Sequence, residues 1–152
     1  MTAVIVGAGN RAHCYAGLAL ERPDLLKIVG VADLNPDRIK YTAERFHLMP
    51  DQCFSSAEEF FSKGKIADAV INGTGDAEHV PTTLPMLDLG YDVLLEKPFA
   101  VSREEAEMFA AAAARSNSKV MICHVLRYAP FYAAVKKHIL NNCVENQHSR
   151  RQ

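Results

Sequence analysis

Short apolar runs alternate with helical patterns along most of the chain. The runs are continuous rather than alternating and are rich in Val, Ile and Leu, which is typical of strands buried on both faces of a parallel sheet. We expect strands at Ala3–Gly7, Leu26–Asp33, Ala67–Thr74, Tyr91–Glu96 and Lys119–Val125, with a short further candidate at Gln52–Phe54.

The segments between these runs carry helix start and stop signals. Asn35 is a capping residue followed by proline at the first helical position. Ser56 and Ser102 are each followed three residues later by a glutamate, which fits a capping box, and Gly90 stands where a helix would end. Strands and helices in strict alternation predict an α/β fold: a doubly wound, mostly parallel six-stranded sheet with helices on both faces, as in a Rossmann fold.

The composition narrows the possible partners. The chain has 152 residues, 49% of them hydrophobic and 23% charged, with a net charge of −1. This balance gives no electrostatic reason to expect nucleic acid or an anionic membrane as a partner. No apolar run approaches the roughly 18 residues of a membrane helix, and Met1 leads into a strand without a signal peptide. The four cysteines lack a metal-ligand spacing, so we expect reduced thiols, no metal site and a cytoplasmic location.

The first apolar run leads into a loop of the form G-x-G-x-x-G/A. The first glycine permits a tight turn, the second lets a pyrophosphate approach the backbone, and the small third residue lets the next helix lie close. The phosphates would meet free amides and the positive end of the helix dipole. A glycine pattern alone is weak evidence, but this one lies between a strand and an apolar-faced helix, as the motif requires. The residues expected to bind a dinucleotide here are Gly7, Gly9, Asn10, Arg11 and Ala12.

Asp33 ends the second predicted strand, 21 residues beyond Ala12. An acidic side chain there accepts hydrogen bonds from the ribose hydroxyls of the adenosine, and it repels the 2′-phosphate of NADP. We therefore expect NAD as the cofactor, with NADP less favoured. Arg38, about one helical turn further on, is either a solvated helix charge or a contact to a phosphate or to the adenine face.

The loop after Ala67–Thr74 is the next candidate. In a doubly wound sheet, ligands bind outside the carboxyl ends of the strands. We expect Thr74, Gly75 and Asp76 to border the ribose or the nicotinamide, although an ordinary strand-to-helix loop would have the same appearance. His79 either reaches this cleft or simply begins the following helix.

Glu96-Lys97-Pro98 follows at the end of the fifth predicted strand. A lysine at the mouth of a buried strand is unusual because an ammonium group is costly to desolvate, but a surface lysine beyond the strand end is the alternative. With the glycine loop, Asp33 and the lead-in Gly90-Tyr91-Asp92-Val93, the segment Leu95-Glu96-Lys97-Pro98-Phe99 resembles the glucose–fructose oxidoreductase / inositol dehydrogenase (Gfo/Idh/MocA) family.

The resemblance implies an NAD(P)-dependent oxidoreductase that transfers hydride between a nicotinamide cofactor and a sugar or cyclitol alcohol. It implies that Lys97 is a catalytic residue placing positive charge beside the reacting hydroxyl. Glu96, Lys97 and Pro98 would border the nicotinamide, so that Lys97 is also a cofactor-binding residue. Glu96 and Pro98 would set the position of this lysine, with a cis Lys97–Pro98 bond as one means. Arg127 matches an arginine that follows the last Rossmann strand of the family; it lies near the cofactor or substrate, or it anchors the chain.

The resemblance extends over residues 1–140, which we expect to form one dinucleotide-binding domain, and residues 141–152 are expected to be a loose polar tail. Members of the family continue into a C-terminal substrate domain, which is absent from this sequence, so we expect the isolated chain to be inactive. This leaves three hypotheses: a domain that works with a separate partner, a non-catalytic NAD-binding sensor or interaction module, and a truncated gene product. A sugar-like substrate is expected once a second domain is supplied, and uncovered apolar surface favours a homo-oligomer.

Overall fold

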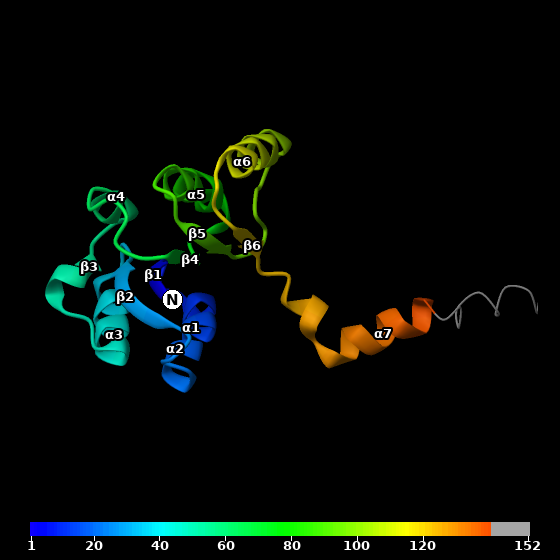
Figure 1. The fold of residues 1–152 in the computed structure, drawn as a ribbon, viewed down its shortest axis with the longest axis horizontal. Coiled ribbons are helices and arrows are strands. Elements are labelled where there is room, and N and C mark those ends of the chain that lie inside the picture. The colour runs from blue at the N-terminus through cyan, green and yellow to red at the C-terminus, as the bar shows by residue number, and fades with distance from the viewer. Residues whose placement is uncertain (141–152) are drawn as a thin grey trace, which may run out of the picture.

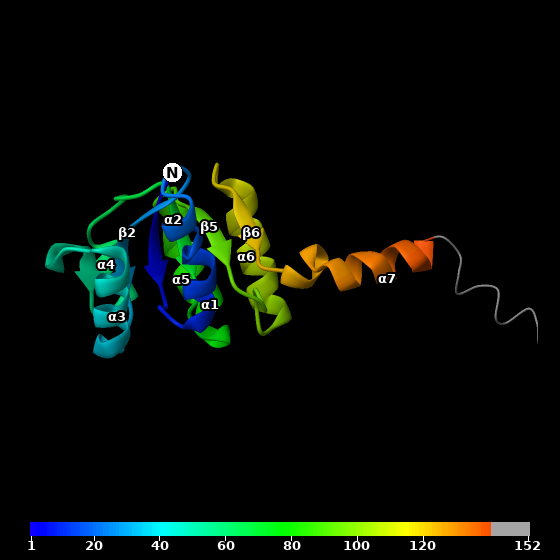
Figure 2. The ribbon, with the colours of Figure 1, turned by 90° about the horizontal axis from the view of Figure 1, so that it is seen from below.

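The computed structural model describes residues 1–140 and shows one parallel sheet with helices on both faces (Figures 1 and 2). The strands are β1 (Thr2–Val6), β2 (Lys27–Ala32), β3 (Cys53–Phe54), β4 (Ala69–Asn72), β5 (Asp92–Leu95) and β6 (Val120–Ile122). Their order across the sheet is β3-β2-β1-β4-β5-β6, and every neighbouring pair is parallel. The direction of winding reverses between β1 and β4, which opens a crevice at the carboxyl ends of these two strands.

The helices form two layers. They are α1 (Asn10–Ala16), α2 (Leu18–Glu21), α3 (Pro36–Phe46), α4 (Ala57–Phe61), α5 (His79–Asp88), α6 (Arg103–Arg115) and α7 (Pro130–Leu140), with short 3-10 turns η1 (Pro50–Gln52), η2 (Asp76–Glu78) and η3 (Val125–Tyr128). Ile5 and its alternate neighbours on the sheet pack against α1, α2 and α3. Val4 and Val6 face the opposite way and pack against α4, α5 and α6. Burial on both faces is what the continuous apolar runs predicted.

The predicted fold is confirmed, and so are all six strands. The first strand has the predicted length but begins one residue earlier, at Thr2, and the other five are shorter than their apolar runs. Residues Gly73 and Thr74, for example, belong to the loop after β4 and not to the strand. The predicted polar tail and Cys143 lie outside the described residues. In residues 1–140 no helix is long and apolar enough to cross a membrane. The same part of the chain has no group of His, Cys, Asp and Glu side chains arranged to hold a metal ion.

The predicted caps are confirmed, with one correction. The side chain of Asn35 accepts a hydrogen bond from the Asp37 amide, and Ser56 and Ser102 cap α4 and α6. In a full capping box the glutamate of the first turn returns to the amide of the capping serine. Here Glu59 accepts instead from the amide of Ser55, one residue further back (2.7 Å), and Glu105 accepts from that of Val101 (3.0 Å).

The turn after β1 packs against the loop after β4 with no space between them. Gly7 has φ +77°, and a Cβ atom added to it would lie 2.5 Å from the Thr74 amide nitrogen. A Cβ atom on Gly73 would lie 2.9 Å from both the Cβ of Ala12 and the carbonyl oxygen of Gly7. The small third residue of the glycine motif therefore lets α1 approach the β4 loop, and Gly73 is required by packing.

We predict that Gly73→Ala lowers the free energy of unfolding by about 1–3 kcal/mol, because the Gly7 carbonyl and the buried Ala12 methyl group cannot easily move away from the added methyl group. Gly75→Ala is the matched control. A Cβ atom on Gly75 meets no atom within 4 Å, so this variant should be neutral or slightly more stable. Urea unfolding followed by circular dichroism measures both. An equal loss of stability in the two variants would contradict this packing.

Candidate functional site

A cavity of about 820 Å³ lies at the carboxyl ends of the central strands, where the sheet order reverses. Most of the residues predicted from the sequence line it: Gly7, Gly9, Asn10, Arg11, Asp33, Arg38, Thr74, Gly75, Asp76, His79, Glu96 and Lys97. Ala12, Pro98 and Arg127 are not among its lining residues. Ala12 is buried beneath the glycine loop, and Arg127 is exposed in η3. The structure thus brings together four strand ends that are far apart in the sequence.

The second glycine of the loop leaves room above the first turn of α1. Gly9 caps this helix in an extended conformation with φ −77°. A Cβ atom added to it would stand 4.0 Å from the nearest atom of another segment, the carbonyl oxygen of Gly73, on the wall of the cavity. A side chain here would fill the cradle without disturbing the protein. The loop therefore fits the pyrophosphate of a dinucleotide, which needs a backbone open to close approach.

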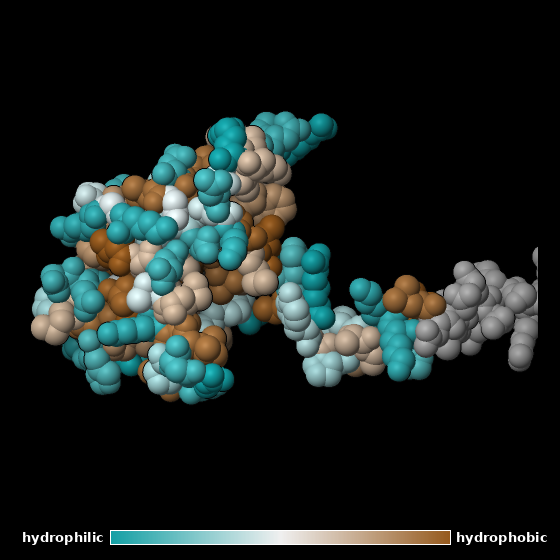
Figure 3. Space-filling model, in the orientation of Figure 1, coloured by the Kyte–Doolittle hydropathy of each residue, from teal (hydrophilic) through white to brown (hydrophobic). Residues whose placement is uncertain are grey.

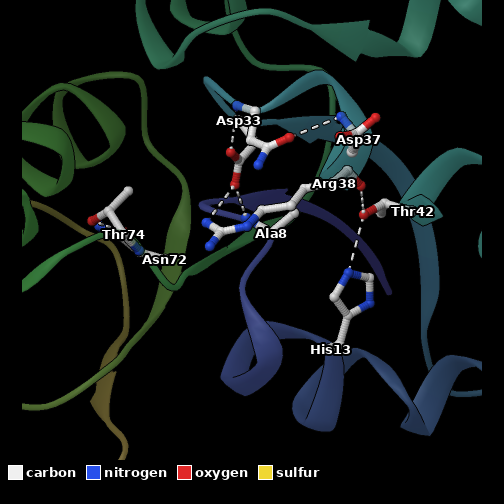
Figure 4. A network of polar contacts seen from close by, with 9 residues as sticks. Ala8, His13, Asp33, Asp37, Arg38, Thr42, Asn72 and Thr74 are labelled. Atoms are coloured by element: carbon white, nitrogen blue, oxygen red, sulfur yellow. Dashed lines mark hydrogen bonds and ion pairs between the residues drawn. The ribbon is translucent and has the colours of Figure 1, made fainter. Parts of the chain in front are cut away.

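Asp33 holds the glycine loop in place as well as facing the cavity (Figure 4). Its carboxylate accepts hydrogen bonds from the amides of Ala8 (2.7 Å) and Asn35 (2.8 Å), and the Arg38 guanidinium lies 3.7 Å away. The side chain is only 7% exposed. A carboxylate offers about four acceptor positions, and the two amides use two of them, since Arg38 at 3.7 Å is too far for a hydrogen bond. The carboxylate therefore keeps free acceptor positions at the cavity.

The loop after β4 is anchored by Asn72, which is almost fully buried. The side-chain oxygen of Asn72 accepts a hydrogen bond from the Thr74 hydroxyl (2.8 Å), and its amide nitrogen donates to the hydroxyls of Thr82 (2.8 Å) and Thr83 (3.0 Å). This network fixes Thr74 at the cavity wall. Thr82 also lines the cavity, and no sequence motif selects it separately.

His79 both begins α5 and lines the cavity, so both alternatives for this residue are met. Its ring is buried, with Nδ1 2.6 Å from the carbonyl oxygen of Pro98 and Nε2 3.1 Å from that of Thr74. The imidazole therefore links the loop after β4 to the segment after β5. With both ring nitrogens against backbone carbonyls, His79 acts on the shape of the site and not as a free donor to a ligand.

Glu96 orients the segment that carries Lys97. One carboxylate oxygen accepts a hydrogen bond from the Lys97 amide (2.7 Å), and the other accepts from the phenol of Tyr15 on α1. Arg11 lies one helical turn before Tyr15, and its guanidinium is 4.0 Å from the same carboxylate. Burial, and then the hydrogen bond to Glu96, raise the pKa of Tyr15 far above its usual value, so the phenol stays protonated and donates. The Lys97–Pro98 bond is cis, as the resemblance implied.

Sequence reasoning missed several residues of the site. Tyr15 had a usable signal, because it lies four positions after Arg11 and therefore on the same face of the helix. Leu34 and Glu58 line the far side of the cavity. The capping pattern that contains Glu58 says nothing of a ligand, and no motif marks Leu34, an apolar side chain that is 84% exposed.

Comparison with known proteins identifies the family of this chain. Residues 1–124 match the oxidoreductase family described by its NAD-binding Rossmann fold. Oxidoreductase P35 of Formosa agariphila is 28% identical over 142 residues, which are 93% of this chain and 43% of that protein. The chain therefore spans less than half the length of this relative.

Two solved structures illustrate the shared fold. The WlbA dehydrogenase from Bordetella pertussis, in complex with NADH and UDP-GlcNAcA, superposes with a TM-score of 0.82 at 22% identity, over 93% of this chain and 42% of that one. The scyllo-inositol dehydrogenase from Lactobacillus casei, with NAD(H) and scyllo-inositol, gives a TM-score of 0.83 at 18% identity, over 95% of this chain and 42% of that one. On the family match and the site geometry together, this chain belongs to the Gfo/Idh/MocA oxidoreductase family with its NAD-binding Rossmann fold.

Proposed function

We propose that this chain binds NAD(H) and forms the dinucleotide-binding domain of an oxidoreductase acting on an alcohol group of a sugar or cyclitol. One observation carries the proposal: the open backbone at Gly9, the Asp33 carboxylate and Lys97 line a single cavity at the reversal point of the sheet. The first two give the cavity a phosphate cradle and a ribose acceptor, which suit a dinucleotide, and Lys97 gives it a cationic end for the reacting hydroxyl of a substrate. Relatives that bind NADH together with a sugar derivative support the substrate class.

The residues of the site have two roles: some bind the cofactor, and others position the groups that react. Gly9 and the amides that begin α1 take the pyrophosphate, and Asp33 takes the ribose of the adenosine. When bound, the nicotinamide supplies the acceptor for a hydride. Lys97 places positive charge beside the hydroxyl group that loses its proton, which favours alkoxide character at that oxygen. Glu96 and His79 hold the segment that carries Lys97 from two sides.

A substrate domain would complete the site. Every residue of α7 is exposed, and the helix extends away from the sheet (Figures 1 and 2). Apolar surface lies on the body beside the start of this helix (Figure 3). On the helix itself, Phe131 is 70% exposed. Relatives such as P35 are more than twice as long as the matched part. A second domain or a second subunit docking on this surface would bury it and close the cavity over the substrate.

Calorimetric titration with NAD, NADH and NADPH tests the proposal. We expect saturable binding of NAD or NADH in the micromolar range and weaker binding of NADPH. The absence of any binding to a folded chain would refute the proposal.

Gly9→Val should weaken NADH binding by at least about tenfold, because the side chain fills the phosphate cradle. The Cβ atom meets no atom of another segment closer than 4.0 Å and the cavity lies beyond it, so the melting temperature should stay within about 2 °C of the parent's. Unchanged affinity in a folded Gly9→Val variant would show that the dinucleotide lies elsewhere.

Asp33→Asn removes the negative charge but keeps an acceptor for the Ala8 amide. The ratio of the affinity for NADH to that for NADPH should fall by about tenfold, because the variant has no carboxylate at this position to repel the 2′-phosphate. Asp51→Asn, on exposed η1, is the control and should leave this preference unchanged. Calorimetry on the three proteins gives the ratios. An undiminished preference in Asp33→Asn would rule out Asp33 as its source.

Lys97→Ala should leave NADH affinity within about threefold of the parent, because we assign Lys97 to the substrate and not to the phosphates.

The 152-residue chain alone should reduce NAD with myo-inositol at a rate close to background, since hydride and proton transfer need both reacting groups aligned. Absorbance at the NADH band monitors the reaction. Rapid turnover by the chain alone would contradict the need for a second domain.

A further inference from the structure

The cavity continues past Asp33 to a region that the ribose and pyrophosphate do not use. This end is lined by Leu34, Arg38, Ala57 and Glu58. The carboxyl ends of β2 and β3 are adjacent here, since the Asp33 amide donates to the carbonyl oxygen of Phe54 (3.3 Å). The first turn of α4 therefore forms the wall opposite α3, and Glu58 belongs to that turn.

The base of the dinucleotide is directed to this end by the rest of the site. In a dinucleotide the adenosine ribose lies between the pyrophosphate and the base. With the pyrophosphate at Gly9 and the ribose at Asp33, the base extends away from the glycine loop and between α3 and α4. This placement of the base rests on the proposed function, and so does any role for the residues around it.

The groups at this end match the faces and the edge of an adenine ring. Leu34 is an apolar side chain that is 84% exposed. One face of the ring can pack against it and remove this apolar surface from water. Arg38 offers a planar guanidinium, a group that stacks on aromatic rings. Glu58 offers a carboxylate, which only accepts hydrogen bonds when ionised. Hydrogen bonds from its own amide and from Ser56 lower the pKa of Glu58, so it is ionised at neutral pH.

We propose that Glu58 is a specificity-determining residue, whose carboxylate accepts a hydrogen bond from the exocyclic amino group of adenine. Hypoxanthine carries a carbonyl oxygen at the same position, and this oxygen is also only an acceptor. A carboxylate facing it would be repelled, so the site should distinguish adenine from hypoxanthine dinucleotides. The discrimination comes from a mismatch of acceptors, and a larger or smaller cavity would not produce it.

The neighbouring Glu59 provides a matched control. Its carboxylate accepts hydrogen bonds from both the amide (2.7 Å) and the hydroxyl (2.6 Å) of Ser55, and it is not a lining residue of the cavity. Two consecutive glutamates on one short helix therefore have different partners. Only Glu58 should affect the choice of base.

Calorimetric titration with NAD and with nicotinamide hypoxanthine dinucleotide tests the proposal. The parent and Glu59→Gln should each bind NAD about tenfold more tightly than the hypoxanthine analogue, the size expected for one hydrogen bond to a charged group. In Glu58→Gln the two affinities should come within about twofold, because a glutamine amide both donates and accepts. Glu58→Lys, which only donates, should reverse the preference.

Two results overturn the assignment of Glu58: equal binding of both dinucleotides by the parent, or a preference for NAD that survives in Glu58→Gln and Glu58→Lys. Glu58 is exposed, so its variants should fold, and their melting temperatures verify this. A folded parent that binds neither dinucleotide is a separate result. It overturns the proposed function, and the assignment of Glu58 with it.

Discussion

The close contact of two backbone turns at the centre of the sheet is the constraint on which the site depends. Gly7, Gly73 and Ala12 meet where β1 and β4 end, and neither glycine has room for a larger side chain. This contact brings α1 up to the loop after β4, and it leaves the space above Gly9 open. The same few small residues therefore permit both the close packing of the two turns and the open backbone at the cavity. Both effects need the preceding strand and the following helix, so a glycine motif is informative only in that context.

Two buried carboxylates then organise the two ends of the cavity. Asp33 accepts the Ala8 amide and so shapes the glycine loop that it faces, while Glu96 accepts the Lys97 amide and is held by Tyr15. Because Tyr15 lies on α1, which begins at the glycine loop, this one helix connects the glycine loop with the segment of Glu96 and Lys97. Each carboxylate is buried at the cavity wall, where a charge needs the hydrogen-bond partners that these amides provide.

Much of this arrangement was predictable from local sequence. Continuous apolar runs predicted six strands, capping residues predicted three helix starts, and strand ends selected most of the cavity lining. The partners of the buried side chains were not predictable. Asp33 and Ala8 are separated by 25 residues, and Tyr15 and Glu96 by 81. Such pairings depend on the order of strands in the sheet and on side-chain direction, which no local pattern specifies. A motif can also select a residue outside the site. Arg127 matches the family pattern after the last strand, but it is not a lining residue of the cavity.

The central claim is that this one cavity takes a dinucleotide, with its pyrophosphate at Gly9 and its adenosine ribose at Asp33. Titration of the ¹⁵N-labelled chain with NADH, monitored by ¹H–¹⁵N NMR, tests it most directly. We expect saturable shifts of the Gly9, Asn10 and Asp33 amides. The amide of Gly64, which precedes β4 and lies outside the cavity, should stay unchanged. Unchanged spectra, or shifts that leave the glycine loop unaffected, would contradict it.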